Sequence, residues 1–141
     1  STTEEKNAIK IQIGKNCRSV GMFYITHHGL ESIIKEFQGQ VELFFESSKE
    51  VKNSVKRRAN NSRGWADDEY TKRKIDTKEI FDFGHKPFEN LPDDAVENIM
   101  LDGYNQWPKS PDLEKFRSVM ESYYKACSEL ASILLSAIAY D

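Results

Sequence analysis

Three histidines are the side chains of this chain best suited to bind a metal or to carry a proton: His27, His28 and His85. His27 and His28 are neighbours in a segment that we expect to be extended, so their rings point to opposite faces and cannot share one ion. No cysteine lies near a histidine in the sequence, and no G-x-S-x-G or glycine-rich phosphate motif occurs. The residues alone therefore predict no catalytic residue and no metal ligand in this chain.

Six acidic residues between positions 67 and 82 form the next candidate group, because clustered carboxylates can bind a hard cation or transfer protons. Their spacing does not fit an EF-hand loop, which needs a central glycine and a closing glutamate. We expect them to be solvated surface residues. The group comprises Asp67, Asp68, Glu69, Asp76, Glu79 and Asp82.

A basic run precedes these acids and carries Lys52, Lys56, Arg57 and Arg58. Such a run could bind phosphate, but cations at the C-terminal end of a helix are also favoured by the helix dipole. No aromatic residues alternate with these charges, as they do on surfaces that bind single-stranded nucleic acid. We expect a solvated helix end and no nucleic-acid partner.

The composition is that of a water-soluble protein. The chain has 141 residues, enough for one domain over residues 1–141. Charged residues make up 30% of it and the net charge is −3, so no global attraction to nucleic acid or anionic membrane is expected. The longest apolar stretch, residues 130–140, is shorter than the roughly 20 residues that cross a bilayer, and the acidic start is unlike a signal peptide. We therefore expect a cytoplasmic protein with no membrane partner.

The N-terminal segment is predicted to form a helix and then a strand. A threonine cap, acidic residues and apolar residues at steps of four predict a helix over residues 4–18. A β-rich apolar run over residues 21–28, whose side chains would point alternately to two partly covered faces, predicts a strand, after which Gly29 lets the backbone turn. Cys17 and, near the C-terminus, Cys127 occupy apolar helical patterns without close spacing, which predicts two buried free thiols.

Two helices are predicted to follow this turn. Apolar residues mark one broad face over residues 30–45. Ser47 with Glu50 fits a capping box, which predicts a short helix that ends near Val55.

The second half of the chain is predicted to contain a short strand and a long helix. Alternation over residues 78–83 predicts the strand, and a short helix is expected at residues 94–100. Trp107 is expected to pack in the interior. The Ser-Pro-Asp sequence at 110–112 predicts the start of a helix whose apolar residues recur as far as Ile138.

The end of that helix, residues 130–140, is apolar on nearly all sides and should be covered on more than one of them. The rest of the chain offers too little surface to cover it. The element pattern as a whole predicts an α+β fold that is mostly helical, with a few short strands.

Four motifs that cover nearly the whole chain carry a family resemblance. The first contains a glycine, several aromatic or aliphatic residues and a His-Gly pair that opens a helix, and the second places an aromatic residue after a glycine. Together, and in this order, they resemble the N-terminal domain of the non-haem iron, 2-oxoglutarate-dependent dioxygenases related to isopenicillin N synthase. The motifs are Gly21–Leu30, Arg63–Trp65, Asp76–Gly84 and Gly103–Pro108.

The resemblance implies a domain that buttresses a double-stranded β-helix, the jelly roll that carries the iron in this family. There, iron is held by a His-x-Asp or His-x-Glu pair and a distant second histidine, and 2-oxoglutarate by an arginine with a serine two residues later. Neither pattern occurs in this chain, which ends at Asp141, about where the jelly-roll strands would begin. We expect no cofactor to be bound by this chain, and Fe(II) and 2-oxoglutarate to be bound by the full-length parent.

The resemblance also gives one candidate substrate-binding residue, Arg63. In some relatives an arginine beside this glycine meets a substrate carboxylate. Trp65 stands where the family usually has a tyrosine. The alternative is that Arg63 is a solvent-facing loop residue. For His28, the resemblance implies packing or a hydrogen bond to the backbone.

Two functions remain open from the sequence. The first is the N-terminal domain of an iron and 2-oxoglutarate-dependent oxidoreductase that acts on a small organic substrate. Its partner is then its own C-terminal β-helix domain, and the fragment alone is inert. The second is a stand-alone helical interaction module, without catalysis, whose apolar last helix docks a partner.

Overall fold

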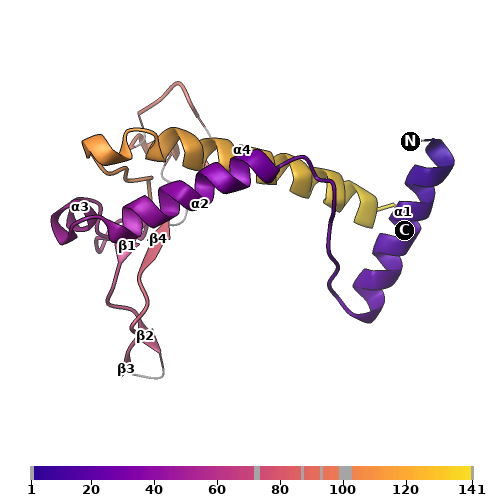
Figure 1. Ribbon diagram of the computed structural model, residues 1–141, viewed down its shortest axis with the longest axis horizontal. Coiled ribbons are helices and arrows are strands. Elements are labelled where there is room, and N and C mark those ends of the chain that lie inside the picture. The colour runs from indigo at the N-terminus through magenta and orange to yellow at the C-terminus, as the bar shows by residue number, and fades with distance from the viewer. Residues whose placement is uncertain (1, 72–73, 87, 93, 99–102, 141) are drawn as a thin grey trace.

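Two antiparallel helices, α2 (Glu31–Glu46) and α4 (Phe116–Ile138), form the long axis of the molecule (Figure 1). This computed structural model describes all residues except 1, 72–73, 87, 93, 99–102 and 141. Helix α1 (Thr3–Ser19) lies at one end, and a β-hairpin projects at the other. The described chain is mostly helical with a few short strands, as predicted.

Helix α1 confirms the prediction for residues 4–18. The Thr2 hydroxyl accepts a hydrogen bond from the Glu5 N–H at 3.2 Å, and the Glu5 carboxylate accepts one from the Thr2 N–H at 2.7 Å, which forms a capping box. The helix packs on the C-terminal end of α4, where the Lys10 amine lies 4.1 Å from the centre of the Tyr140 ring.

The prediction that both thiols are buried is wrong for Cys17, which is exposed. The apolar spacing of α1 was expected to mark a covered face, but most side chains of α1 remain in solvent because its main contact is with α4. Cys127 is half-buried, and its thiol hydrogen-bonds Tyr123 and thereby raises the pKa of that phenol.

The predicted strand over residues 21–28 is also wrong. The segment is not helical, but no strand of the described chain lies beside it, so its backbone groups are not paired in a ladder. A strand needs a neighbour to accept and donate these hydrogen bonds. Met22 and Tyr24 are 73% and 100% exposed, and His27 has a left-handed φ of 57°.

The second predicted helix is confirmed by α2, whereas the predicted cap of the next helix, α3 (Lys49–Ser54), is displaced by one residue. Ser48 caps α3 by accepting a hydrogen bond from the Val51 N–H at 3.4 Å. Ser47 ends α2 instead, and its hydroxyl donates to the Phe44 carbonyl at 2.6 Å.

Two predicted helix starts are short 3-10 turns. The helix expected at residues 94–100 is observed as η1 (Val96–Asn98), and residues 99–100 lie outside the described part. The start expected at 110–112 is η2 (Pro111–Leu113), and the Ser110 side chain makes no capping hydrogen bond. Helix α4 therefore begins only at Phe116.

The core lies where α2 and α4 meet a small antiparallel sheet of β1 (Gly64–Ala66) and β4 (Ile80–Asp82). Phe81 of this sheet packs on two core rings, with centroid distances of 4.8 Å to Phe44 and 5.2 Å to Phe116. Trp107 is half-buried against the same cluster, as predicted. The buried members are Phe44, Val55, Trp65, Leu113, Phe116 and Met120.

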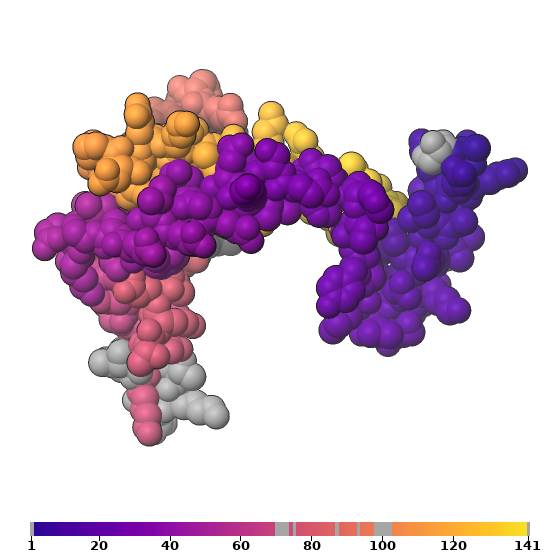
Figure 2. Space-filling model, viewed as in Figure 1, coloured from indigo at the N-terminus to yellow at the C-terminus, as the bar shows by residue number. Residues whose placement is uncertain are grey.

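The strand predicted at residues 78–83 is confirmed in its centre by β4. Beyond the β1–β4 sheet, β2 (Tyr70–Thr71) pairs with β3 (Lys74–Ile75) in a hairpin that projects from the body (Figure 1). Figure 2 shows that this hairpin and α1 extend to the same side of the α2–α4 pair, which gives the molecule the outline of an arch.

The C-terminal half of α4 is only partly covered by the described chain, where α1 packs on it and Ala137 is buried. Ile133 and Leu135 are 67% and 65% exposed, and they are two residues apart, so they face different sides of the helix. This confirms the prediction that the chain does not enclose its last helix. Within the described ranges, no helix combines the length and the apolar character needed to cross a membrane.

Candidate functional site

Arg63 lies in the loop before β1, and its side chain reaches the loop that follows β4. Arg63 as a whole is half-buried. Its Nη1 donates to the side-chain oxygen of Asn105 at 2.9 Å and to the carbonyl oxygen of His85 at 3.3 Å. The family resemblance gave Arg63 as a substrate-binding residue, and the structure places it in a defined position rather than on a free loop.

The main chain around Arg63 is fixed by two buried amides. Asn61 accepts a hydrogen bond from the Arg63 N–H at 3.2 Å and donates to the Tyr104 carbonyl at 3.0 Å. Gln106 donates to the Arg63 carbonyl at 2.7 Å and to the Lys56 carbonyl at 3.2 Å. Buried amides stabilise a loop when their donors and acceptors are satisfied in this way. Arg63 therefore starts from a rigid backbone.

Asn105 connects Arg63 to the loop after β4. Its side-chain oxygen accepts from the Gly84 N–H at 3.0 Å as well as from Arg63, and its side-chain nitrogen donates to the Gly84 carbonyl at 2.9 Å. The residue is buried. Sequence reasoning missed Asn105, although it lies inside the Gly103–Pro108 motif.

Arg63 differs from its basic neighbours in the kind of partner it has. Lys52 pairs with Glu79 at 2.9 Å, Lys56 with Asp67 at 2.9 Å and Arg57 with Glu69 at 2.8 Å. Arg63 makes no ion pair with any described residue, and both of its acceptors are neutral oxygens. Its positive charge is therefore not compensated within the described chain.

The expectation of solvated surface residues holds for Arg58, which is exposed, but most members of the acidic group and of the basic run are paired rather than singly solvated. The two segments pair with each other across the β1–β4 sheet. Asp67 binds both Lys49 and Lys56, and Arg57 binds both Glu69 and Asp82. These partners are far apart in the sequence, so neither segment alone indicated the pairing.

The ion pairs shift the titration of the carboxyl groups. Hydrogen bonds from Lys49 and then Lys56 lower the pKa of Asp67 to about 2. A hydrogen bond from Arg57 lowers the pKa of Glu69, and one from Lys52 lowers the pKa of Glu79. These carboxylates stabilise the fold as anions, which does not suit them to proton transfer near neutral pH.

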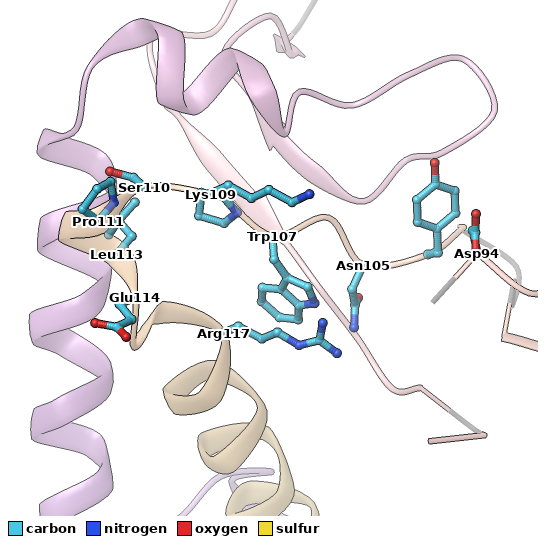
Figure 3. A pocket seen from close by; sticks show the side chains of 11 residues that line it. Asp94, Asn105, Trp107, Lys109, Ser110, Pro111, Leu113, Glu114 and Arg117 are labelled. Carbon is cyan, nitrogen blue, oxygen red and sulfur yellow. The ribbon is translucent and has the colours of Figure 1, made fainter. Parts of the chain in front are cut away.

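A hollow of about 810 Å³ opens beside Asn105, at the start of α4 (Figure 3). The Arg117 guanidinium lies 5.7 Å from the centre of the Trp107 ring, and Lys109 extends along the same wall. The indole N–H of Trp107 is buried and has no hydrogen-bond partner among the residues that the structure describes. The walls carry charges of both signs, including Asp94 and the two basic residues.

A second hollow of about 570 Å³ is also lined by Asn105 and Arg117. Gly84 and His85 form one wall, and Tyr124 of α4 forms the other. The His85 and Tyr124 rings lie nearly parallel at 6.4 Å. Asn105 therefore lines both hollows and also accepts the hydrogen bond from Arg63.

The three histidines do not come together. His27 is exposed. His28 accepts a hydrogen bond from the Leu30 N–H at 3.0 Å, which confirms the backbone bond that the resemblance implied. In the part of the chain that the structure describes, no three His, Cys, Asp or Glu side chains lie close enough to hold a metal ion. The described residues therefore do not fit an iron site.

Comparison with known proteins identifies relatives over most of the chain. The family profile described as "non-haem dioxygenase in morphine synthesis N-terminal" matches residues 1–110. Homoarginine-6-hydroxylase 2-ODD-C23 of Glycine max is 32% identical over 132 residues, which cover 91% of this chain and 39% of the relative. The 1-aminocyclopropane-1-carboxylate oxidase of Dictyostelium mucoroides is 24% identical over 141 residues, 96% of this chain and 38% of the relative.

A fungal relative has a similar extent. The 2-oxoglutarate-Fe(II) type oxidoreductase ppzD of Metarhizium majus is 28% identical over 140 residues, 86% of this chain and 39% of the relative. No solved structure matches the chain. The chain spans about two fifths of the length of these relatives. Because the profile covers most of its residues, the chain belongs to the family of N-terminal domains of 2-oxoglutarate and iron-dependent non-haem dioxygenases.

Proposed function

We propose that this chain forms the N-terminal domain of a cytoplasmic oxidoreductase that uses Fe(II) and 2-oxoglutarate to oxidise a small organic substrate. The two cofactors supply the oxidising chemistry when they are bound by the full-length protein. This chain contributes a scaffold and part of the substrate site. The observation that carries the proposal is the apolar surface left uncovered on both sides of the end of α4, where Ile133 and Leu135 stand in solvent.

The partner of this surface is the protein's own C-terminal β-helix domain. Monomeric proteins rarely leave a large contiguous apolar patch exposed, and the relatives are more than twice as long as the matched region. The extended residues 22–25 offer a second contact, since no strand of the described chain pairs with their backbone groups and their side chains are apolar or aromatic. The open side of the arch in Figure 2 leaves room for such a domain.

Two observations test this assignment directly. The coding sequence beyond Asp141 should contain a His-x-Asp or His-x-Glu pair, a distant histidine and an Arg-x-Ser pair. The purified 141-residue chain should retain no stoichiometric iron in elemental analysis and should not consume 2-oxoglutarate. Iron with turnover in the fragment contradicts the assignment, and a downstream sequence without these residues favours the stand-alone interaction module instead.

Arg63 is proposed to bind a carboxylate of the substrate. Two of the relatives are named for homoarginine and for 1-aminocyclopropane-1-carboxylate, and both compounds are amino acids with a free carboxylate. A guanidinium held in place without a carboxylate partner suits this group, because arginine can bind a carboxylate through two parallel hydrogen bonds. The proposed substrate class is therefore a small amino acid or a related carboxylic acid.

The test is a comparison of Arg63→Gln with wild type in the full-length enzyme, with homoarginine and 1-aminocyclopropane-1-carboxylate as probes. Losing a charge-assisted contact of about 1.5–3 kcal/mol should raise the dissociation constant of the better probe roughly 10- to 100-fold. Arg58→Gln is the matched control, because Arg58 is exposed in the same region and its side chain has no described partner. If Arg63→Gln and Arg58→Gln bind the probe with equal dissociation constants, the proposed role of Arg63 is contradicted.

A further inference from the structure

The acceptors of Arg63 are chemically unusual for this molecule. Other cations beside the sheet are neutralised by carboxylates, as in the pairs of the buried Lys52 with Glu79 and of the half-buried Arg57 with Glu69. The side chain that orients Arg63 is an amide, Asn105. An amide fixes the position of a guanidinium without cancelling its charge.

The bonding of Asn105 leaves no freedom in the orientation of its amide group. Its oxygen faces the Gly84 N–H and its nitrogen faces the Gly84 carbonyl, so a flipped amide would oppose both backbone groups. The oxygen is therefore fixed on the side where it meets Arg63 at 2.9 Å.

Gly84 supplies a surface on which the guanidinium lies. A Cβ atom at this position would come within 2.7 Å of Arg63 Nη1 and 2.9 Å of Arg63 Cζ. The φ angle of Gly84 is not in the left-handed region, so the backbone accepts a side chain, but that side chain would displace the guanidinium of Arg63. The glycine at position 84 therefore matters for where the Arg63 guanidinium lies, and not for the local backbone conformation.

The remaining donors of Arg63 suit a ligand. In the side chain of Arg63, only Nη1 makes hydrogen bonds to the described residues. Nε and Nη2 have no such bond, and they are not among the buried polar atoms that lack a partner. Nε and Nη2 form the edge through which a guanidinium binds both oxygens of a carboxylate. This edge is left open when Nη1 is held from the other side.

We propose that Asn105 and Gly84 are positioning residues that hold Arg63 through Nη1, while keeping its net positive charge and its Nε–Nη2 edge available for a substrate carboxylate. This inference rests on the proposed role of Arg63. It assigns a function to Asn105 beyond stabilising the loop, because a carboxylate at this position would hold the guanidinium equally well and would neutralise it.

The experiment compares each probe with its methyl ester in the full-length enzyme, since the ester lacks the negative charge. Calorimetry gives the dissociation constants of the ester and of the free acid for homoarginine and for 1-aminocyclopropane-1-carboxylate, and the ratio of the two constants is the readout. For the probe that binds more tightly, we expect wild type to bind the free acid at least 10-fold more tightly than its methyl ester. We expect this preference to disappear in Arg63→Gln and in Asn105→Asp. A role of Asn105 in stability alone would weaken the acid and the ester equally and leave the ratio unchanged.

Gly84→Ala is the second variant, because the introduced methyl group displaces the guanidinium without changing any charge. We expect it to reduce the preference at least 3-fold, whereas Gly39→Ala, where a methyl group meets no atom within 4 Å, should not change it. A preference that survives in both Asn105→Asp and Gly84→Ala, but not in Arg63→Gln, overturns the positioning role and retains the role of Arg63. A preference that survives in Arg63→Gln, or that is absent from wild type, overturns both.

Discussion

Lys52 is the residue whose charge is most deeply enclosed in the described chain, at 8% exposure. Its amine donates to Glu79 at 2.9 Å and to the Phe45 carbonyl at 3.1 Å, and the same carboxylate accepts the Trp65 indole N–H at 3.0 Å. Glu79 therefore satisfies a buried cation and a buried indole together. Removing one partner of such a group leaves the other without compensation.

We predict that Glu79→Ala lowers the free energy of unfolding by roughly 1–3 kcal/mol, because the Lys52 amine and the Trp65 N–H both lose an acceptor. Urea unfolding followed by tryptophan fluorescence measures the effect. Glu42→Ala is the control, since Glu42 is exposed on α2. The double variant Lys52→Met/Glu79→Ala should recover part of the loss, and a Glu79→Ala protein as stable as the control would contradict this account.

Asp67 gives the fold a defined sensitivity to acid. Lys49 and Lys56 hold its pKa at about 2, below the value of roughly 3.9 expected in the unfolded chain. The folded state therefore binds fewer protons than the unfolded state between these values, so this stabilisation is complete above about pH 4 and is lost as the pH falls towards 2.

We predict that Asp67→Asn is less stable than wild type at pH 7 and that the difference narrows as the pH falls from 4 to 2. Urea midpoints measured across this range test the prediction. Asp112→Asn, at an exposed position in η2, should follow the wild-type curve. Glu69 and Glu79 also have lowered pKa values, so the variant should keep part of the acid dependence. A constant difference between Asp67→Asn and wild type would show that the charge of Asp67 is not responsible.

Residue-scale features were the hardest to predict from the sequence. The basic run and the acidic group were both recognised, but their pairing joins residues 11 and 27 positions apart, as in Lys56–Asp67 and Lys52–Glu79. Asn105 meets Gly84 and Arg63 across 21 and 42 positions. Such contacts depend on the fold and leave no local pattern, whereas Arg63 was found through a family motif.

At the scale of elements, local periodicity predicted the helices and failed for the strand at residues 21–28. Helices satisfy their own hydrogen bonds, so α1, α2 and α4 could be recognised from spacing and caps. Alternation in a strand indicates only that a segment can be pleated, and the pairing must come from elsewhere. The strand at 78–83 was predicted correctly because its partner β1 lies within this chain.

The junction between α3 and β1 depends on a glycine. Gly64 has a φ of 109°, and a Cβ atom there would overlap the Val55 carbonyl oxygen and approach the Gln106 amide at 2.7 Å. The Val55 carbonyl accepts the Trp65 N–H at 2.8 Å, so this close contact anchors the start of the sheet.

We predict that Gly64→Ala lowers the free energy of unfolding by about 2 kcal/mol or more, because both the backbone conformation and the contact with Val55 are incompatible with a side chain. Gly39→Ala is the matched control inside α2, where it should add roughly 0.5–1 kcal/mol. Chemical denaturation of both variants measures the two shifts. Shifts of the same sign would contradict the distinction drawn between the two glycines.

At the scale of the whole molecule, the arch exposes apolar side chains at several separate places. Besides the end of α4, they include Ile9 and Ile11 of α1 and Tyr24 of the extended segment. The core, by contrast, is concentrated at the other end of α2 and α4, around Phe44 and Trp65. The described chain is therefore well packed at one end, while the end formed by α1 and the last turns of α4 is only sparsely packed.

This distribution predicts opposite effects of one substitution in two contexts. Leu135→Glu keeps a good helix-forming residue in α4 and places a charge on exposed apolar surface. In the isolated chain it should reduce concentration-dependent association in analytical ultracentrifugation and leave the thermal midpoint nearly unchanged. In the full-length enzyme it should destabilise the protein by roughly 1.5–3 kcal/mol, because burial of the leucine against the C-terminal domain is lost.

Ser122→Glu adds the same charge at an exposed polar position of α4 and should have neither effect. If Leu135→Glu leaves the full-length enzyme as stable as Ser122→Glu does, α4 is not the surface that the C-terminal domain covers.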